Sequence, residues 1–193
     1  MTTTPTRLSK SARREQLLDA ALTLVRDSGA DGLSLPTLAE AAGVSRPIVY
    51  DHFGTRPGLL LALYRRLDER HRAVTTQALS TAEPSAAGIA RVISAAYFAC
   101  ATDMPEFNAV SAALKGDPEM EAIQHDMYAS YTDLMATALA PYSSLTADAL
   151  RLHCVGALGA AEAIAAELNR ERASTDDAIT ALTGLIMGRL DTA

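Results

Sequence analysis

The chain has 193 residues, of which 49% are apolar and 21% are charged, a balance typical of folded proteins rather than disordered ones. Its 11 Gly and 8 Pro residues exclude collagen-like and linker-like sequences and are too few for a many-stranded β-sandwich. Residues 1–72 hold 11 Lys/Arg against 8 Asp/Glu, whereas residues 73–193 hold 6 against 15. This split of the net charge of −6 indicates that only the front part meets a polyanion, unless like charges gather there by chance.

Hydrophobic spacing predicts helices along the whole chain. The first has apolar residues at helical spacing and ends at Gly29, and two short helices then follow Ser34 and Ser45 as N-caps. After Thr55, a longer helix is expected from Arg56 to about Leu79. Beyond the break at residues 83–85, the expected helices cover roughly 86–102, 105–115, 118–140, 147–170 and 175–190. The predicted fold class is therefore all-α, with the best domain boundary near residues 80–85.

No membrane span or secretory signal is expected. The most apolar stretch, 152–166, is interrupted by His153 and Glu162 and is shorter than the roughly 18 residues that a span needs. No hydrophobic segment follows the first basic residues. Cys100 and Cys154 lie far apart and form neither a disulfide framework nor a metal motif. We therefore predict a cytoplasmic protein with no membrane partner.

Residues 34–53 have the spacing of a helix-turn-helix. Ala39 is small where the two helices would cross, Gly43 supplies the left-handed backbone of the turn, and Val49 packs the second helix onto the first. This packing sets the second helix at the angle needed for the DNA major groove. The alternative is an ordinary helical hairpin.

These residues resemble the TetR family of bacterial transcription regulators. The resemblance is carried by the motifs Leu38-Ala39-x-x-Ala42-Gly43-Val44-Ser45, Val49-Tyr50-x-His52-Phe53 and Arg56-x-x-Leu59-Leu60. Beyond residue 80 only the helical layout and the length are similar. Two positions depart from the family pattern: Arg56 stands where Lys is usual, which keeps the charge, and Pro57 replaces an acidic residue in a helix's first turn, where proline is tolerated.

The resemblance implies an N-terminal three-helix DNA-binding domain joined to a larger helical domain for effector binding and dimerisation. On this reading, residues 1–12 form a basic arm, residues 13–56 the helix-turn-helix domain, residues 57–82 a connecting helix, and residues 83–193 the effector and dimerisation domain.

Several side chains of the second short helix lie off its Val49/Phe53 face and can meet DNA. Arg46 can donate to guanine O6 and N7 or contact a phosphate, and Ile48 can touch a thymine methyl or join the core. Asp51 can accept from cytosine N4 or cap locally. Tyr50 and His52 resemble the family's phosphate-contacting pair, with a packed His52 as the alternative. The predicted DNA-binding set is Ser34, Thr37, Ser45, Arg46, Pro47, Ile48, Tyr50, His52 and Arg56.

Hydroxyls and helix N–H groups at the start of the first short helix can bind phosphate, as Arg56 can from the next long helix. The basic arm either contacts the duplex or is simply solvated; its residues are Arg7, Lys10, Arg13 and Arg14.

Residues 85–193 contain no catalytic or metal-binding motif, so we predict no enzyme and no cofactor. Aromatic, Met and polar residues of the middle helices either line an apolar effector pocket or form a plain core: Tyr97, Cys100, Phe107, Met127, Tyr128, Tyr131 and His153. Small and apolar residues of the last two helices either pair with a second subunit or are buried within one: Val155, Leu158, Glu162, Leu182, Leu185 and Ile186.

The combined prediction is a homodimeric repressor that binds double-stranded DNA at an inverted-repeat operator and is released by a small apolar or amphipathic effector. The alternatives are an activator, a regulator without a ligand, or a helical enzyme or interaction module tethered to DNA.

Overall fold

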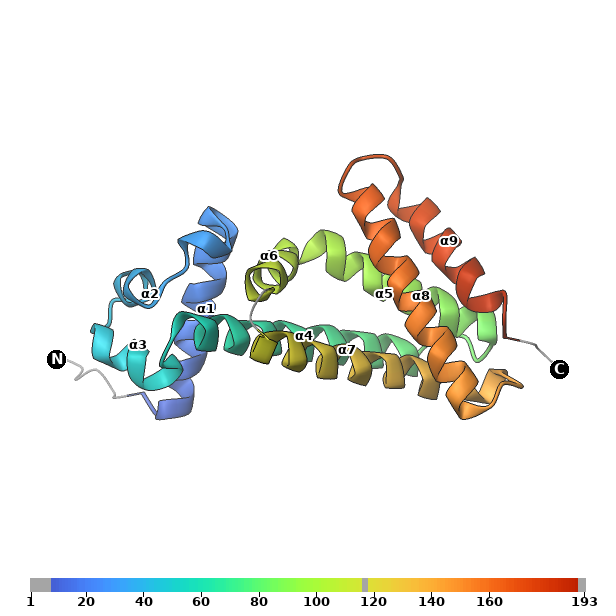
Figure 1. The fold of residues 1–193 in the computed structure, drawn as a ribbon, viewed down its shortest axis with the longest axis horizontal. Helices are drawn as coiled ribbons and strands as arrows, with labels where there is room; N and C mark the ends of the chain where they lie inside the picture. Colours follow the sequence, from blue (N-terminus) through green and yellow to red (C-terminus); the bar gives the residue numbers. More distant parts are fainter. Residues whose placement is uncertain (1–7, 116–117, 191–193) are drawn as a thin grey trace, which may run out of the picture. The chain divides into compact units, whose positions relative to one another are not determined.

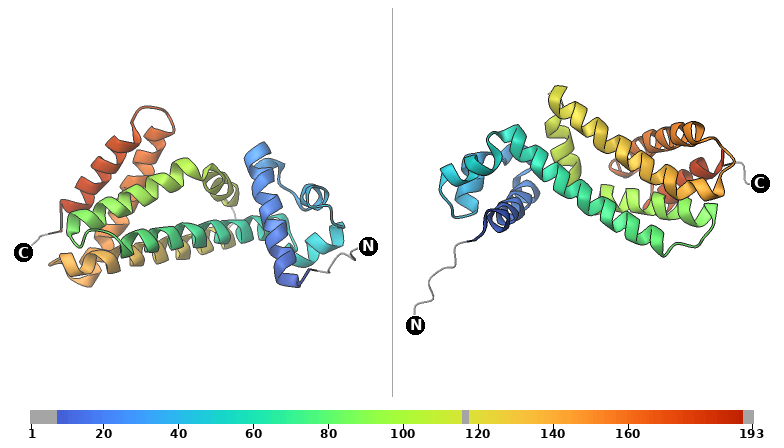
Figure 2. Two further views of the ribbon diagram at one scale, coloured as in Figure 1. Left: turned by 180° about the vertical axis from the view of Figure 1, so that it is seen from behind. Right: turned by 90° about the horizontal axis from the view of Figure 1, so that it is seen from below.

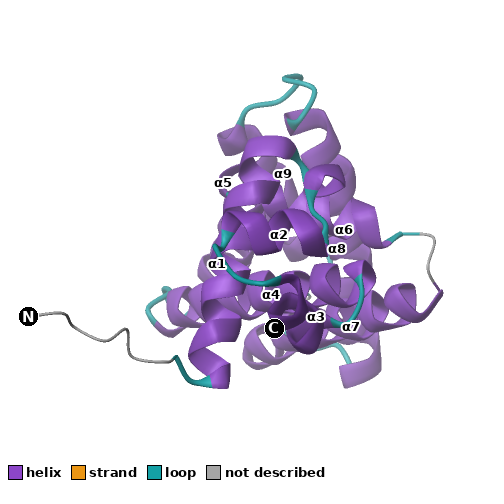
Figure 3. Ribbon diagram, turned by 90° about the vertical axis from the view of Figure 1, so that its left-hand side faces the viewer, coloured by secondary structure: helices purple, strands orange, loops and turns teal. Residues whose placement is uncertain are grey.

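The computed structural model describes residues 8–115 and 118–190. Throughout these ranges the chain forms helices and loops without a strand (Figure 3). The helices are α1 Lys10–Ser28, α2 Leu35–Ala41, α3 Arg46–Phe53, α4 Arg56–Ser80, α5 Ala86–Asp103, α6 Pro105–Leu114, α7 Pro118–Leu139, α8 Ala147–Leu168 and α9 Thr175–Met187, with short 3-10 turns at Ala30–Gly32 (η1) and Ala140–Tyr142 (η2) (Figure 1). The all-α fold is confirmed.

Local signals account for most of the helix ends. The Ser34 hydroxyl accepts a hydrogen bond from the Thr37 amide at 3.2 Å, and the Thr55 hydroxyl accepts one from the Gly58 amide, also at 3.2 Å. Gly29 and Gly43 adopt left-handed φ angles of 73° and 63°, a region that other residues rarely enter. These caps and turns lie where the sequence predicts them.

The capping role predicted for the Ser45 side chain is wrong. Ser45 stands at the N-cap of α3, but its hydroxyl makes no capping hydrogen bond. Proline at position 47 removes one amide donor from the first turn, and the Ile48 amide donates to the Ser45 carbonyl at 3.1 Å. The Ser45 hydroxyl is therefore not needed to start the helix.

The chain divides into two compact units, and the division differs from the single boundary expected near residues 80–85. The first unit holds α1 to α3, α4 as far as Leu67, and α6; the second holds α4 from Asp68, α5, α7 from Glu121, α8 and α9. The reason is that α6 packs on α1 and η1, a tertiary contact that no local pattern reveals.

In the second unit, α5, α8 and α9 pack on one another (Figures 1 and 2). Apolar residues from these helices and from α7 form its core, among them Ile93, Phe98, Met135, Leu158 and Ile186. Contrary to expectation, α8 reaches the length and hydropathy of a membrane span, with 22 residues and a mean hydropathy of 1.3. One such helix is a weak indication by length and composition alone; 28% of the tested stretch of α8 is buried, on the face that packs in this core.

Candidate functional site

The helix-turn-helix is built by close packing around the turn between α2 and α3. The Val44 amide donates to the Ala39 carbonyl at 3.0 Å, and Gly43 makes the left-handed turn. Val49 and Phe53 are buried and turn one face of α3 toward the first unit's core. The opposite face of α3 consequently points away from this core.

The outward face of α3 is polar and exposed. Arg46, Pro47, Tyr50 and Asp51 are exposed, and Ile48 is only partly buried. Asp51 neither caps the helix nor packs into the core; its Oδ2 lies 3.1 Å from Lys10 Nζ at the start of α1. The Lys10 contact could not be predicted, because it joins two residues far apart in the sequence.

Three basic residues predicted in the N-terminal arm, Lys10, Arg13 and Arg14, lie instead on α1. Arg14 donates to the His52 carbonyl at 2.8 Å, and its guanidinium stands 4.9 Å from the centre of the Phe53 ring. Arg13 donates to Gln16 Oε1 at 2.6 Å. Arg14 thus ties the C-terminal end of α3 to α1. Arg7 lies outside the described residues.

His52 is partly buried beside Phe53, with ring centres 6.1 Å apart. Burial and the positive charge of Lys10 lower the pKa of His52. The imidazole is therefore mostly neutral at neutral pH and can donate one N–H to a phosphate or a base edge.

Three residues predicted to contact phosphates are engaged within the protein. The Ser34 and Thr37 side chains form a reciprocal capping box at the start of α2. Arg56 donates from Nε to the Leu33 carbonyl and from Nη2 to the Ala30 carbonyl, both at 2.8 Å. These contacts stabilise the approach to α2, so only the remaining donors of each group are free for DNA.

Comparison with known proteins identifies this domain. Residues 17–63 match the family model for bacterial regulatory proteins of the tetR family. Over 89 residues, 46% of this chain, it is 36% identical to the HTH-type transcriptional regulator BetI of Paraburkholderia phymatum. Residues 17–63 therefore form a DNA-binding domain of the TetR family. The matched part spans 45% of that curated relative's length, and the family is one of regulators rather than enzymes.

Solved structures show that the TetR-like fold extends over nearly the whole chain. A TetR-family regulator from Rhodococcus sp. superposes with a TM-score of 0.72 at 24% identity, covering 93% of this chain and 99% of that one. The regulator FadR from Bacillus subtilis, solved in complex with stearoyl-CoA, gives 0.70 at 14% identity and covers 90% and 98%.

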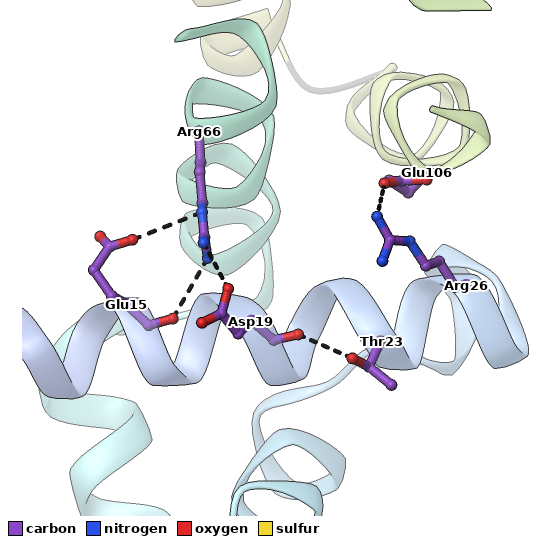
Figure 4. A network of polar contacts seen from close by, with 6 residues as sticks. All are labelled: Glu15, Asp19, Thr23, Arg26, Arg66 and Glu106. Atoms are coloured by element: carbon purple, nitrogen blue, oxygen red, sulfur yellow. Dashed lines mark hydrogen bonds and ion pairs between the residues drawn. The ribbon is translucent and has the colours of Figure 1, made fainter. Parts of the chain in front are cut away.

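Ion pairs between α1 and the helices α4 and α6 help to hold the first unit together (Figure 4). Arg66 Nη2 on α4 lies 2.6 Å from Asp19 Oδ1, and Arg66 also contacts Glu15. Further along α1, Arg26 Nη2 lies 2.6 Å from Glu106 Oε1 on α6. The Glu106 side chain is only 1% exposed, so the Arg26 contact is central to docking α6 onto α1.

The residues predicted to form one effector pocket fall into three places. Tyr97, Cys100, Met127, Tyr128 and Tyr131 lie on α5 and α7 of the second unit. Phe107 belongs to the first unit, where its ring packs 4.9 Å from Tyr64. His153 lies on α8, with Nε2 2.8 Å from the Ile186 carbonyl. The seven residues are thus divided between the two units, and the effector pocket stays a prediction.

The α5 and α7 tyrosines form a cluster with residues that the sequence did not single out. The His71 ring of α4 stacks 5.2 Å from Tyr131, and the Thr75 hydroxyl donates to the His71 carbonyl at 2.9 Å. Burial raises the pKa of Tyr97 and of Tyr131, and the charge of Glu162 adds to this rise at Tyr97. Glu162 itself is exposed, and its place in a dimer interface stays a prediction.

Burial also shifts two ionisable groups of α4 toward their neutral forms. It raises the pKa of Asp68 to about 6 and lowers the pKa of His71 to about 4. Neither residue carries a local motif, and only their place inside the second unit makes them notable.

The predicted dimer residues divide between the core and the surface. Leu158, Leu182 and Ile186 are buried inside the second unit, so these three predicted contacts are corrected: their side chains stabilise the subunit itself. Val155 is partly buried. Leu185 is 50% exposed and Leu152, which the prediction omitted, is 71% exposed. Both line a surface hollow of about 320 Å³ with Ala149, His153, Gly156, Ala157, Ala160 and Arg189.

Proposed function

We propose that this protein is a transcriptional repressor that binds an inverted-repeat DNA operator as a homodimer and is released by a small apolar or amphipathic effector. The observation that most supports this proposal is the exposed polar face of α3, opposite the buried Val49 and Phe53. Such a face suits base edges in the major groove. The cytoplasm is the compartment in which this function operates.

The exposed leucines of α8 and α9 support the proposal of a dimer. Two recognition helices related by a twofold axis read two half-sites in mirrored order. The hollow lined by Leu152 and Leu185 offers each subunit an apolar surface for pairing with a second copy.

The tyrosine cluster of the second unit supports an effector with apolar parts and a hydrogen-bonding group. Tyr97 and Tyr128 supply ring faces and hydroxyls, and the structurally similar FadR was solved with stearoyl-CoA. An effector that binds the DNA-incompetent state more tightly must weaken DNA binding, and DNA must weaken effector binding to the same degree.

Selection of duplexes from a random pool tests the DNA-binding proposal. The wild type should enrich an inverted repeat, and Arg46→Ala should lose about 1–3 kcal/mol at one base of each half-site. Equal binding to selected and scrambled duplexes would exclude sequence-specific binding.

The effector proposal is tested separately with stearoyl-CoA and a panel of apolar metabolites and drugs. Compounds that raise the melting temperature are titrated into the complex with the selected duplex. Compounds that bind without changing DNA affinity would argue against release by an effector.

A further inference from the structure

Asp51 occupies the centre of the DNA-facing side of α3. The inward direction of α3 is set by the buried side chains of Val49 and Phe53. At about 3.6 residues per turn, a residue two positions away is rotated by about 200° around the helix. Asp51 stands two positions after Val49 and two before Phe53, so it points almost directly away from the core. Its side chain is 67% exposed, in keeping with this geometry.

An acidic side chain at this position weakens the sequence-independent electrostatic attraction between the protein and DNA. Its charge is repelled by the phosphates on both sides of the groove. A carboxylate accepts hydrogen bonds and donates none, so only an amino group on a base edge can compensate it. Cytosine offers N4–H₂ in the major groove, whereas adenine places the acceptor N7 beside its amino group, where it repels a second carboxylate oxygen.

Lys10 contacts only one of the two oxygens of this carboxylate. Lys10 Nζ contacts Asp51 Oδ2 at 3.1 Å, and both side chains are largely exposed. Among residues 8–115 and 118–190, no hydrogen-bond partner engages Asp51 Oδ1. The lysine partly neutralises the acid and leaves one oxygen to accept from a base.

We propose that Asp51 is a specificity-determining residue that accepts a hydrogen bond from cytosine N4 in each half-site, and that Lys10 is the residue that positions its carboxylate. This inference rests on the proposed DNA-binding function and adds to it the base read by one named side chain. Cytosine is preferred for two reasons. It donates a hydrogen bond to the Asp51 carboxylate, and bases without a suitable amino group leave the charge of that carboxylate unpaired.

The test is duplex selection from a random pool with the full-length wild type, Asp51→Ala, Asp51→Asn and a matched control, Asp27→Asn. Asp27 is an exposed acid on the same helix as Lys10, roughly 25 Å further along α1 at about 1.5 Å per residue. Far-ultraviolet circular dichroism and thermal unfolding establish that each variant is folded, which the exposure of Asp51 leads us to expect.

The wild type should prefer cytosine at one symmetric position of each half-site. Asp51→Ala should lose roughly tenfold of that preference, the range of a single good base contact, and bind scrambled duplexes more tightly. Asp51→Asn should move the preference toward adenine, because an amide can pair with N6 and N7 together. Asp27→Asn should match the wild type.

The role of Lys10 is tested by the same selection. Lys10→Met should reduce the cytosine preference, and Lys10→Arg should restore it, whereas a merely structural tie would leave base preference unchanged in both variants.

The possible failures are distinct. A wild type that enriches no sequence overturns the DNA-binding proposal and this inference together. A wild type that enriches an inverted repeat, with Asp51→Ala keeping every base preference, overturns the role of Asp51 alone and leaves the function standing.

Discussion

Helices α3 and α8 each present a face that their own unit does not cover, but the two faces have opposite chemistry. The α3 face carries Arg46, Tyr50 and Asp51, whereas the α8 face carries Leu152 beside Gly156. Hydrogen-bonding side chains are suited to base edges and phosphates, and an exposed leucine beside a hollow is suited to another apolar surface. In the proposed function, this difference assigns a nucleic acid to the first unit and the surface of a second subunit to the second.

The largest effect is expected from a charge placed on the exposed apolar face of α8. Leu152→Glu should convert the dimer to monomers, because it places a charge in an apolar interface, and operator binding should then be lost with the second half-site. Analytical ultracentrifugation at micromolar concentration measures the first effect and DNA titration the second.

Two controls separate the interface from the core. Val74→Glu changes another exposed apolar residue of the second unit away from the hollow and should leave the dimer intact. Leu158→Glu buries a charge in the core and should unfold the protein. A wild type that sediments as a monomer would contradict the dimer itself.

The two units also bury their charged groups differently. In the first, Glu106 of α6 is buried against Arg26, whereas Arg66 of α4 pairs with Asp19, an exposed residue of α1 (Figure 4). Arg26→Met should cost about 2 kcal/mol of unfolding free energy, less than a fully buried pair because Arg26 is half exposed. Arg66→Met should cost about 0–1 kcal/mol.

Chemical denaturation at one fixed protein concentration measures both variants, since the stability of the proposed dimer would depend on concentration. Equal losses would mean that the burial of Glu106 adds nothing to the strength of its ion pair.

In the second unit, Asp68 and His71 give a smaller effect that depends on pH. The unfolded chain protonates His71 near its ordinary pKa of 6.5 and the folded protein only near about 4, so acidification between these values destabilises the fold. Asp68 acts in the opposite direction: its pKa is about 6 in the folded protein against an ordinary 3.8, so protonation through this window stabilises the fold.

These two effects should nearly offset each other in the wild type between pH 7 and pH 5. His71→Asn should therefore gain stability relative to the wild type on acidification, and Asp68→Asn should lose it, each by roughly 1–2 kcal/mol. The test compares the unfolding midpoints of the wild type and both variants at pH 7 and at pH 5. If the midpoints of all three proteins change equally between the two pH values, neither residue governs the pH dependence of stability.

The sequence alone determined the helices, the turn at Gly43 and the direction in which α3 presents its polar face. These features depend on residues a few positions apart, through caps, left-handed glycines and helical spacing. The orientation predicted for a helix agrees with the structure where one face is clearly apolar and the other polar, as in α3.

Only the tertiary structure decided which apolar side chains of α8 and α9 face inward, and which unit α6 joins. Leu152 and Leu158 are equally apolar, and α8 has apolar or small residues on most sides, so spacing cannot tell its core face from its exposed face. The contacts of α8 with α5 and α9 bury Leu158 and leave Leu152 exposed. Likewise, Arg26 and Glu106 are 80 positions apart, and such a contact exists only once packing brings distant segments together, because no local hydrogen bond or spacing encodes it.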